Sequence, residues 1–154
     1  MKTYVLMLSK EFPATHPRKG EPTGFVSKVI SAIKQIEGEW WKLHTIRANY
    51  PLWAKRIAEV QRGEAVLSIR IWLGAPYRSK QIEIVRLTKD DGVGIQELVF
   101  WTGRIGYPTV GNYQPLIKEI ALNDGLLRDD WVYWFKNYDK TKTMAIIHFT
   151  NFRY

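Results

Sequence analysis

The fold of this chain is decided by the stretch Lys42-Leu43-His44-Thr45-Ile46-Arg47. Residues 43–47 are mostly apolar or β-branched, which predicts a strand. Asn49-Tyr50-Pro51 then opens a helix, because proline is favoured in the first helical turn, and Gly63 is placed to end it. Residues 65–73 are again rich in side chains that favour strands. The stretch therefore predicts a strand, a helix and a second strand in succession.

The chain before this unit reads as a strand, a loop and a helix. Residues 3–8 form a short apolar run, which predicts a buried strand. Residues 9–22 contain three prolines and a glycine, so we expect either a lid over a site or a solvated connection. From Thr23, the expected N-cap, apolar residues recur on one helical face, and Gly38 lies where a helix-ending glycine would.

The chain after the unit continues with strands and then helices. Residues 81–87 predict a strand, Asp90-Asp91-Gly92 a hairpin turn, and residues 95–102 its antiparallel partner. A short helix at 116–122 is followed by a second one near Leu127, whose first turn holds two aspartates that complement the helix dipole.

The pattern closes with a strand at residues 143–149, which are rich in β-branched and aromatic side chains. Five or six strands with helices between them, mostly antiparallel, favour an α+β barrel over a doubly wound parallel sheet. The length of 154 residues and a hydrophobic share of 45% indicate one domain spanning residues 1–154.

Composition favours a polyanionic partner inside the cell. Lysine and arginine number 23 against 15 acidic residues, and the resulting formal charge of +8 attracts phosphate backbones. The chain has no cysteine, no signal-peptide pattern and no apolar run of about 20 residues, so we expect a cytoplasmic protein without membrane contact. Three scattered histidines and the absence of a glycine-rich phosphate loop predict neither a metal nor a cofactor.

Two separated blocks of the sequence are similar to a known family. The first is Lys-x-x-Thr-Ile-Arg at residues 42–47, followed by a helix and by Gly63 before a strand. The second is Asp124-Gly125-Leu126, followed by an aromatic helix at 131–135 and the strand 145–149. In this order they resemble the ASCH domain family of the PUA-like superfamily. The resemblance implies a PUA-like mixed, mostly antiparallel β-barrel with inserted helices and a cleft lined by the Thr-Ile-Arg strand.

The resemblance implies two alternative functions for that cleft. In the first, it binds RNA or a modified nucleoside. In the second, the chain is similar to small amidohydrolases that act on N4-acetylcytidine, and Lys42 would be the base, Thr45 the nucleophile and Asp124 the proton donor in place of the usual glutamate. A third possibility, that the cleft binds another protein, has no sequence signal of its own.

The enzymatic alternative makes physical demands on these residues. A threonine hydroxyl attacks only if a base takes its proton, and a lysine is a base near neutral pH only if burial lowers its pKa. The general acid would need a raised pKa. Lys42 and Thr45 are three residues apart and would point to opposite faces of a regular strand, so Lys42 must precede the strand.

Other residues are candidates for ligand contacts. Arg47 in an apolar strand is costly unless it meets a carboxylate or a phosphate. His44 is either a contact to a base edge or a strand histidine with a structural role. Further candidates are two tryptophans that could stack on bases and three cations of the basic loop, namely Trp40, Trp41, Lys10, Arg18 and Lys19.

Overall fold

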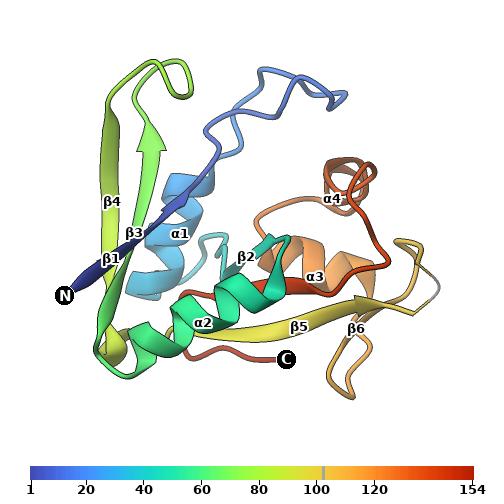
Figure 1. Ribbon diagram of the computed structural model, residues 1–154. Coiled ribbons are helices and arrows are strands. Elements are labelled where there is room, and N and C mark those ends of the chain that lie inside the picture. The colour runs from blue at the N-terminus through green and yellow to red at the C-terminus, as the bar shows by residue number, and fades with distance from the viewer. Residues whose placement is uncertain (102) are drawn as a thin grey trace.

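The computed structural model describes residues 1–101 and 103–154. Its elements, shown in Figure 1, follow in the order β1 (Lys2–Met7), α1 (Phe25–Lys34), β2 (His44–Arg47), α2 (Tyr50–Gln61), β3 (Ala65–Trp72), β4 (Gln81–Leu87), a 3-10 turn (Lys89–Asp91), β5 (Gly94–Phe100), β6 (Pro108–Val110), α3 (Ile117–Asn123), α4 (Arg128–Trp134) and β7 (Met144–His148).

The strands form two separate sheets, so the expected closed β-barrel is wrong. In the described residues the strand orders are β1-β3-β4 and β2-β7-β5-β6. The α+β class is confirmed, and within these ordered strands only β1 and β3 pair in parallel. In Figure 1, β3 and β4 stand upright at the left, whereas β5 runs across the lower half of the molecule.

The barrel does not close because β4 and β5 are not partners. The predicted hairpin turn is a 3-10 turn in which Thr88 Oγ1 accepts from the Asp90 N–H while the Thr88 N–H donates to Asp91 Oδ2. Gly92 leaves this turn at φ 82°, and the chain then enters the other sheet, where β5 pairs with β6 and β7. β4 pairs instead with β3. Residue 102, the end of the predicted partner strand, lies outside the described residues.

Helix α2 forms where the sequence predicts it and packs against both sheets. The Asn49 side chain accepts from the Leu52 N–H at 3.4 Å, and Pro51 lies in the first turn. The buried face consists of Trp53, Ile57 and Val60, and the helix contacts β3 on one side and β5 and β7 on the other. The apolar face therefore joins two sheets that share no strand pair.

Helix α1 begins later than predicted. Gly24 at φ 71° is its N-cap, and Gln35 at φ 53° ends it, three residues before Gly38. The hydroxyl of Thr23, the expected cap, donates to the Ser9 carbonyl at 2.7 Å and lies 3.3 Å from the Phe25 N–H. Thr23 thus ties the helix start to the end of β1.

The N-terminal loop, residues 9–24, is packed against α4 rather than solvated along its length. The ring of His16 is buried, and its Nε2 donates to the Asp130 carbonyl at 3.1 Å because its Nδ1 accepts from the Arg18 N–H. The Arg18 guanidinium donates to the Asp130 carboxylate at 2.6 Å.

Of the helices among residues 1–101 and 103–154, not one is long and apolar enough to cross a membrane.

Candidate functional site

Lys42 lies in the interior, between α1 and α3. Its backbone N–H donates to the Lys28 carbonyl at 3.0 Å, and the next N–H, of Leu43, donates to the Asn123 carbonyl at 2.8 Å. Because β2 begins only at His44, the lysine precedes the strand, as the spacing to Thr45 requires. Its side chain is buried, with 1% of the residue exposed.

The Asp124-Gly125 turn encloses the lysine head group. Lys42 Nζ donates to Asp124 Oδ1 at 2.7 Å and to the Asp124 carbonyl at 2.6 Å. Gly125 has φ 82°, and a Cβ on it would lie 3.2 Å from the Lys42 side chain. The ring of Phe25 lies 4.3 Å from Nζ and adds a cation–π contact. The two similar blocks of sequence are therefore in direct contact.

Burial and charge act in opposite directions on this pair. Burial, the largest single effect, would raise the pKa of Asp124, but the Lys42 ammonium and the neighbouring His44 together outweigh it and hold that pKa below its ordinary value. Burial lowers the pKa of Lys42, and the adjacent carboxylate opposes this effect. Asp124 is therefore ionised, which differs from the raised pKa that a general acid would need.

His44 lies beside the Asp124 carboxylate and is hydrogen-bonded to Tyr154. Asn123 Nδ2 donates to the Tyr154 hydroxyl at 3.1 Å, so that hydroxyl donates its own proton to His44 Nε2, 2.6 Å away. This leaves the proton of the neutral ring on Nδ1, which lies 3.6 Å from Asp124 Oδ1, longer than a hydrogen bond. The histidine is fully buried, and burial lowers its pKa. Its place behind the carboxylate favours a structural role.

A small cavity, called the pocket below, opens beside this pair. It has a volume of about 100 Å³. Four of the predicted site residues line it: Lys42, Thr45, Arg47 and Asp124. The other lining residues come from the segment after β1, the start of α1, β2 and the region around α4: Leu8, Ser9, Phe25, Ile46, Leu126, Trp134, Phe135 and Tyr138.

The Thr45 side chain is free to bind a ligand in the pocket. Thr45 is 6% exposed, and its hydroxyl makes no hydrogen bond to any residue that the structure describes. Lys42 and Thr45 line the same pocket, but the ammonium is directed to Asp124. The hydroxyl can therefore donate to or accept from a bound group.

Arg47 lies at the junction of the pocket and a larger cavity. One guanidinium nitrogen, Nη2, donates to the Met7 carbonyl, whereas the buried Nε has no hydrogen-bond partner among the described residues. No acidic side chain in the described part of the chain lies within ion-pair distance of it. Burial lowers the pKa of this guanidinium, which still stays protonated at neutral pH. The arginine is a partly buried cation without an acidic partner among the described residues.

The larger cavity, called the groove below, has a volume of about 760 Å³. Residues 7–13 line it on one side and residues 72–77 on the other, and Arg47 lies between them. Lys10 belongs to this lining, and its ammonium donates to the Leu73 carbonyl at 2.8 Å. Of the predicted loop cations, Lys10 is the one that borders the same cavity as Arg47.

The remaining predicted contacts lie elsewhere. Trp40 Nε1 donates to the Leu122 carbonyl, and its ring face is covered by Lys28 Nζ at 3.8 Å. Trp41 Nε1 donates to the Ile36 carbonyl. Neither ring lines the pocket or the groove. Both indoles are held by the backbone around α1 and α3, so neither is a stacking platform for a base in the pocket.

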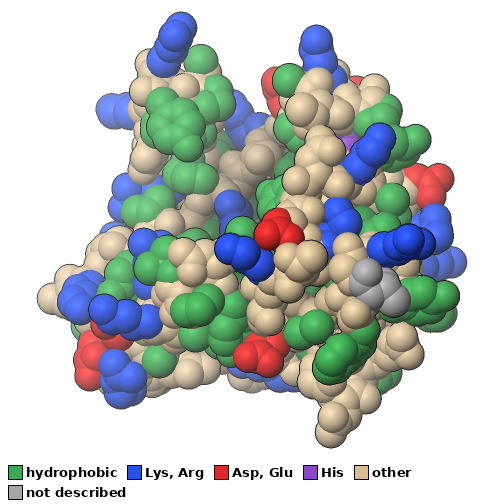
Figure 2. Space-filling model, turned by 45° about the vertical axis from the view of Figure 1, so that its right-hand side comes forward, with side chains coloured by type: hydrophobic (Ala, Val, Ile, Leu, Met, Phe, Trp, Pro, Cys, Tyr) green, Lys and Arg blue, Asp and Glu red, His purple; other side chains and the backbone are tan. Residues whose placement is uncertain are grey.

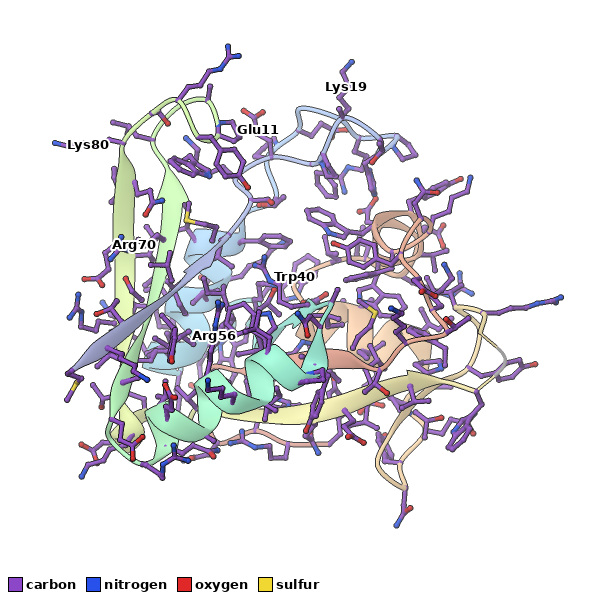
Figure 3. All side chains as sticks on the ribbon, viewed as in Figure 1. Glu11, Lys19, Trp40, Arg56, Arg70 and Lys80 are labelled. Atoms are coloured by element: carbon purple, nitrogen blue, oxygen red, sulfur yellow. The ribbon has the colours of Figure 1, made fainter. Side chains whose placement is uncertain are left out.

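The other two loop cations are also outside the pocket. Arg18 is paired with Asp130 and Glu21, and Lys19 is exposed at the loop tip, where Figure 3 shows it extending from the molecule. Sequence reasoning missed Ser9 and Tyr138 in the pocket and Tyr154 behind His44. No motif marks these residues, because they reach the site only through tertiary packing.

The described residues include no group of three or more histidine, cysteine, aspartate or glutamate side chains that could hold a metal.

A scan against protein-family models, a search of curated proteins and a search of solved structures each found no match to this chain. The similarity to the ASCH family accordingly rests on the quoted residues and stays a prediction.

Proposed function

We propose that the protein binds a nucleobase of RNA, or a modified nucleoside, in the pocket. The observation that supports this most strongly is the partly buried Arg47, whose buried Nε–H has no hydrogen-bond partner and which has no acidic neighbour in ion-pair range within the described chain. Burying a cation without an anion is costly, and a phosphate or a polar base edge would supply the missing acceptor.

The pocket is large enough for the edge of a nucleobase and too small for the whole ring. A protein cavity of roughly 150 Å³ holds a benzene molecule, so an opening of about 100 Å³ admits the edge of a base while the sugar stays in the groove. Thr45 offers a hydroxyl and Asp124 an acceptor oxygen, and polar groups of this kind read the edges of unstacked bases.

Binding of fluorescein-labelled single-stranded RNA at low salt tests the proposal. We expect measurable affinity that falls with rising salt and decreases by about tenfold in Arg47→Ala, because a charge-assisted contact contributes roughly 1.5 to 3 kcal/mol. Arg62→Ala removes an equal charge from the exposed end of α2 and is the matched control. Lack of affinity at low salt, or equal affinity of the folded Arg47→Ala protein, would overturn the proposal.

We propose an amidohydrolase activity as the second candidate, because Lys42 is buried, its pKa is lowered and it shares the pocket with Thr45. The Thr45 oxygen would attack the acyl carbon of an N4-acylated cytidine, forming a threonine ester and releasing the amine. Water would then hydrolyse the ester. The step would need Lys42 in its neutral form, which burial favours and the Asp124 carboxylate opposes. Because Asp124 is ionised, the neutral Lys42 amine would take the proton of Thr45 and then pass it to the leaving amine.

Turnover of N4-acetylcytidine to cytidine, followed by chromatography, tests this second candidate. We expect Lys42→Ala and Thr45→Val each to abolish release, and Thr45→Ser to retain part of it. Release that survives both of the first two substitutions, or no release by the folded wild-type protein, would rule out the enzyme. Binding without release would leave the first proposal intact.

A further inference from the structure

We propose that the groove is a second subsite that binds the nucleotides next to the one in the pocket, so the ligand is a single RNA strand rather than a free nucleoside. This inference rests on the proposed function. Figure 2 shows the molecule hollowed between two raised lobes. One lobe is the turn between β3 and β4, residues 73–80, and the other includes the N-terminal loop.

The pocket and the groove are continuous. Leu8, Ser9 and Arg47 line both cavities. A base in the pocket would therefore have its sugar and phosphate beside the Arg47 guanidinium, at the inner end of the groove. With about 760 Å³ against about 100 Å³, the groove has room for neighbouring nucleotides that the pocket cannot hold.

The walls of the groove carry the charge that a phosphate backbone needs. Lys10 lines one wall, and Arg78 and Lys80 are exposed just beyond the lining of the other, in the turn between β3 and β4. Glu11 is the one acidic residue in the described lining. Figure 3 shows Glu11 beside the gap, whereas Lys80 extends outward from the outer side of β4. Within the described lining, Lys10 and Arg47 are two cations against the one acid, which favours a polyanion over a neutral or cationic segment.

The same turn presents two aromatic rings to a strand lying in the groove. Trp72 and Tyr77 both line it, with ring centroids 5.2 Å apart and planes at 49°. Tyr77 is 90% exposed although its backbone is left-handed, at φ 62°. The Tyr77 ring therefore contacts the Trp72 ring on one side and leaves most of its surface open to a ligand. Exposed rings among cations are the usual stacking surface for single strands.

Affinity measured against ligand length tests the inference. The probes are a mononucleotide and single-stranded RNA of about eight nucleotides, within the span of one small single-strand-binding fold. We expect the oligomer to bind at least tenfold more tightly and with a steeper salt dependence, by about 0.7 per additional phosphate contact. In the protein with both Arg78→Ala and Lys80→Ala, the salt dependence of oligomer binding should be less steep and closer to that of mononucleotide binding.

Tyr77→Ala separates the subsite from the pocket. We expect about tenfold weaker oligomer binding and unchanged mononucleotide binding, because the tyrosine ring stacks on bases in the groove and does not line the pocket. Tyr107→Ala, which removes another exposed tyrosine, at 58% exposure and outside the groove, is the matched control. Both variants remove exposed side chains and should fold.

The outcomes distinguish the two proposals. If the mononucleotide and the oligomer bind equally, or Tyr77→Ala weakens both to the same extent, the second subsite is disproved while the pocket proposal stands. If neither probe binds at low salt, the proposed function itself fails. If the groove binds a protein instead of RNA, substituting Tyr77, Arg78 or Lys80 should leave the affinity for RNA unchanged. That result would also disprove the subsite.

Discussion

The ammonium of Lys42 lies 2.7 Å from the carboxylate of Asp124, across a separation of 82 positions in the chain. Both side chains are almost fully buried. The contact fixes the Asp124-Gly125 turn against the residue that precedes β2, and it leaves one wall of the pocket charged. It therefore has consequences for both stability and binding.

Removing one charge of this pair should destabilise the protein strongly. We expect Asp124→Asn to lower the free energy of unfolding by about 3 to 5 kcal/mol, because the buried Lys42 ammonium loses its counter-charge. Urea denaturation measures the change. Asp129→Asn removes an exposed carboxylate of α4 and should cost under about 1 kcal/mol. Equal losses of unfolding free energy in the two variants would show that the buried ion pair contributes no more to stability than an exposed carboxylate does.

The stability should decrease on acidification from about pH 6.5. Burial, with smaller effects from His44 and Arg153, lowers the pKa of His148 from 6.5 to about 2. The unfolded chain therefore binds a proton below pH 6.5 that the folded protein does not, and stability falls by up to about 1.4 kcal/mol per pH unit. Denaturation curves between pH 7 and 5 should show a shallower decline in His148→Gln. An unchanged slope would contradict the assignment.

Tyr154 should determine which nitrogen of His44 carries the proton. In the wild-type protein we expect ¹⁵N chemical shifts typical of a protonated Nδ1 and an unprotonated Nε2, because the Tyr154 hydroxyl donates to Nε2. Tyr154→Phe removes that donor and should shift the population toward a protonated Nε2. Identical nitrogen shifts in the two proteins would mean that Asn123 and Tyr154 do not set the tautomer.

Gly125 should tolerate a side chain less well than another glycine with the same backbone angle. Gly20 and Gly125 both have φ 82°. A Cβ added at Gly20 would meet nothing within 4 Å, whereas a Cβ added at Gly125 would lie 3.2 Å from the Lys42 side chain. We expect Gly20→Ala to cost about 1 kcal/mol and Gly125→Ala about 2 to 3 kcal/mol of unfolding free energy. Equal costs would indicate that contact with Lys42 is unimportant.

Local signals in the sequence predicted most of the helices and strands. They did not predict which strands pair, because pairing depends on residues far apart in the chain. Helix α2 was foreseeable because Asn49, Pro51 and Gly63 act on neighbouring backbone. The barrel was not, because it required β4 and β5 to pair across Asp90-Asp91-Gly92, and the capping box there sends the chain to the other sheet instead. A turn sequence fixes the local conformation, not the partner of the strand that follows.

The candidate site was predicted in part for a related reason. Lys42, Thr45, Arg47 and Asp124 share one pocket because each belongs to a recognisable block. Trp40 and Trp41 lie near that block in sequence but donate to carbonyls outside the pocket. Proximity along the chain is a weak guide to the direction of a side chain, since one bend in the backbone changes it.

Asp130, at the start of α4, holds the N-terminal loop in place. It holds the N-terminal loop through Arg18 and His16, and that loop is a wall of the groove. It also lies six positions after Asp124, whose carboxylate borders the pocket. One short segment, residues 124–130, therefore carries both the charge that borders the pocket and the anchor of the N-terminal loop, so a change in its length would displace the two together.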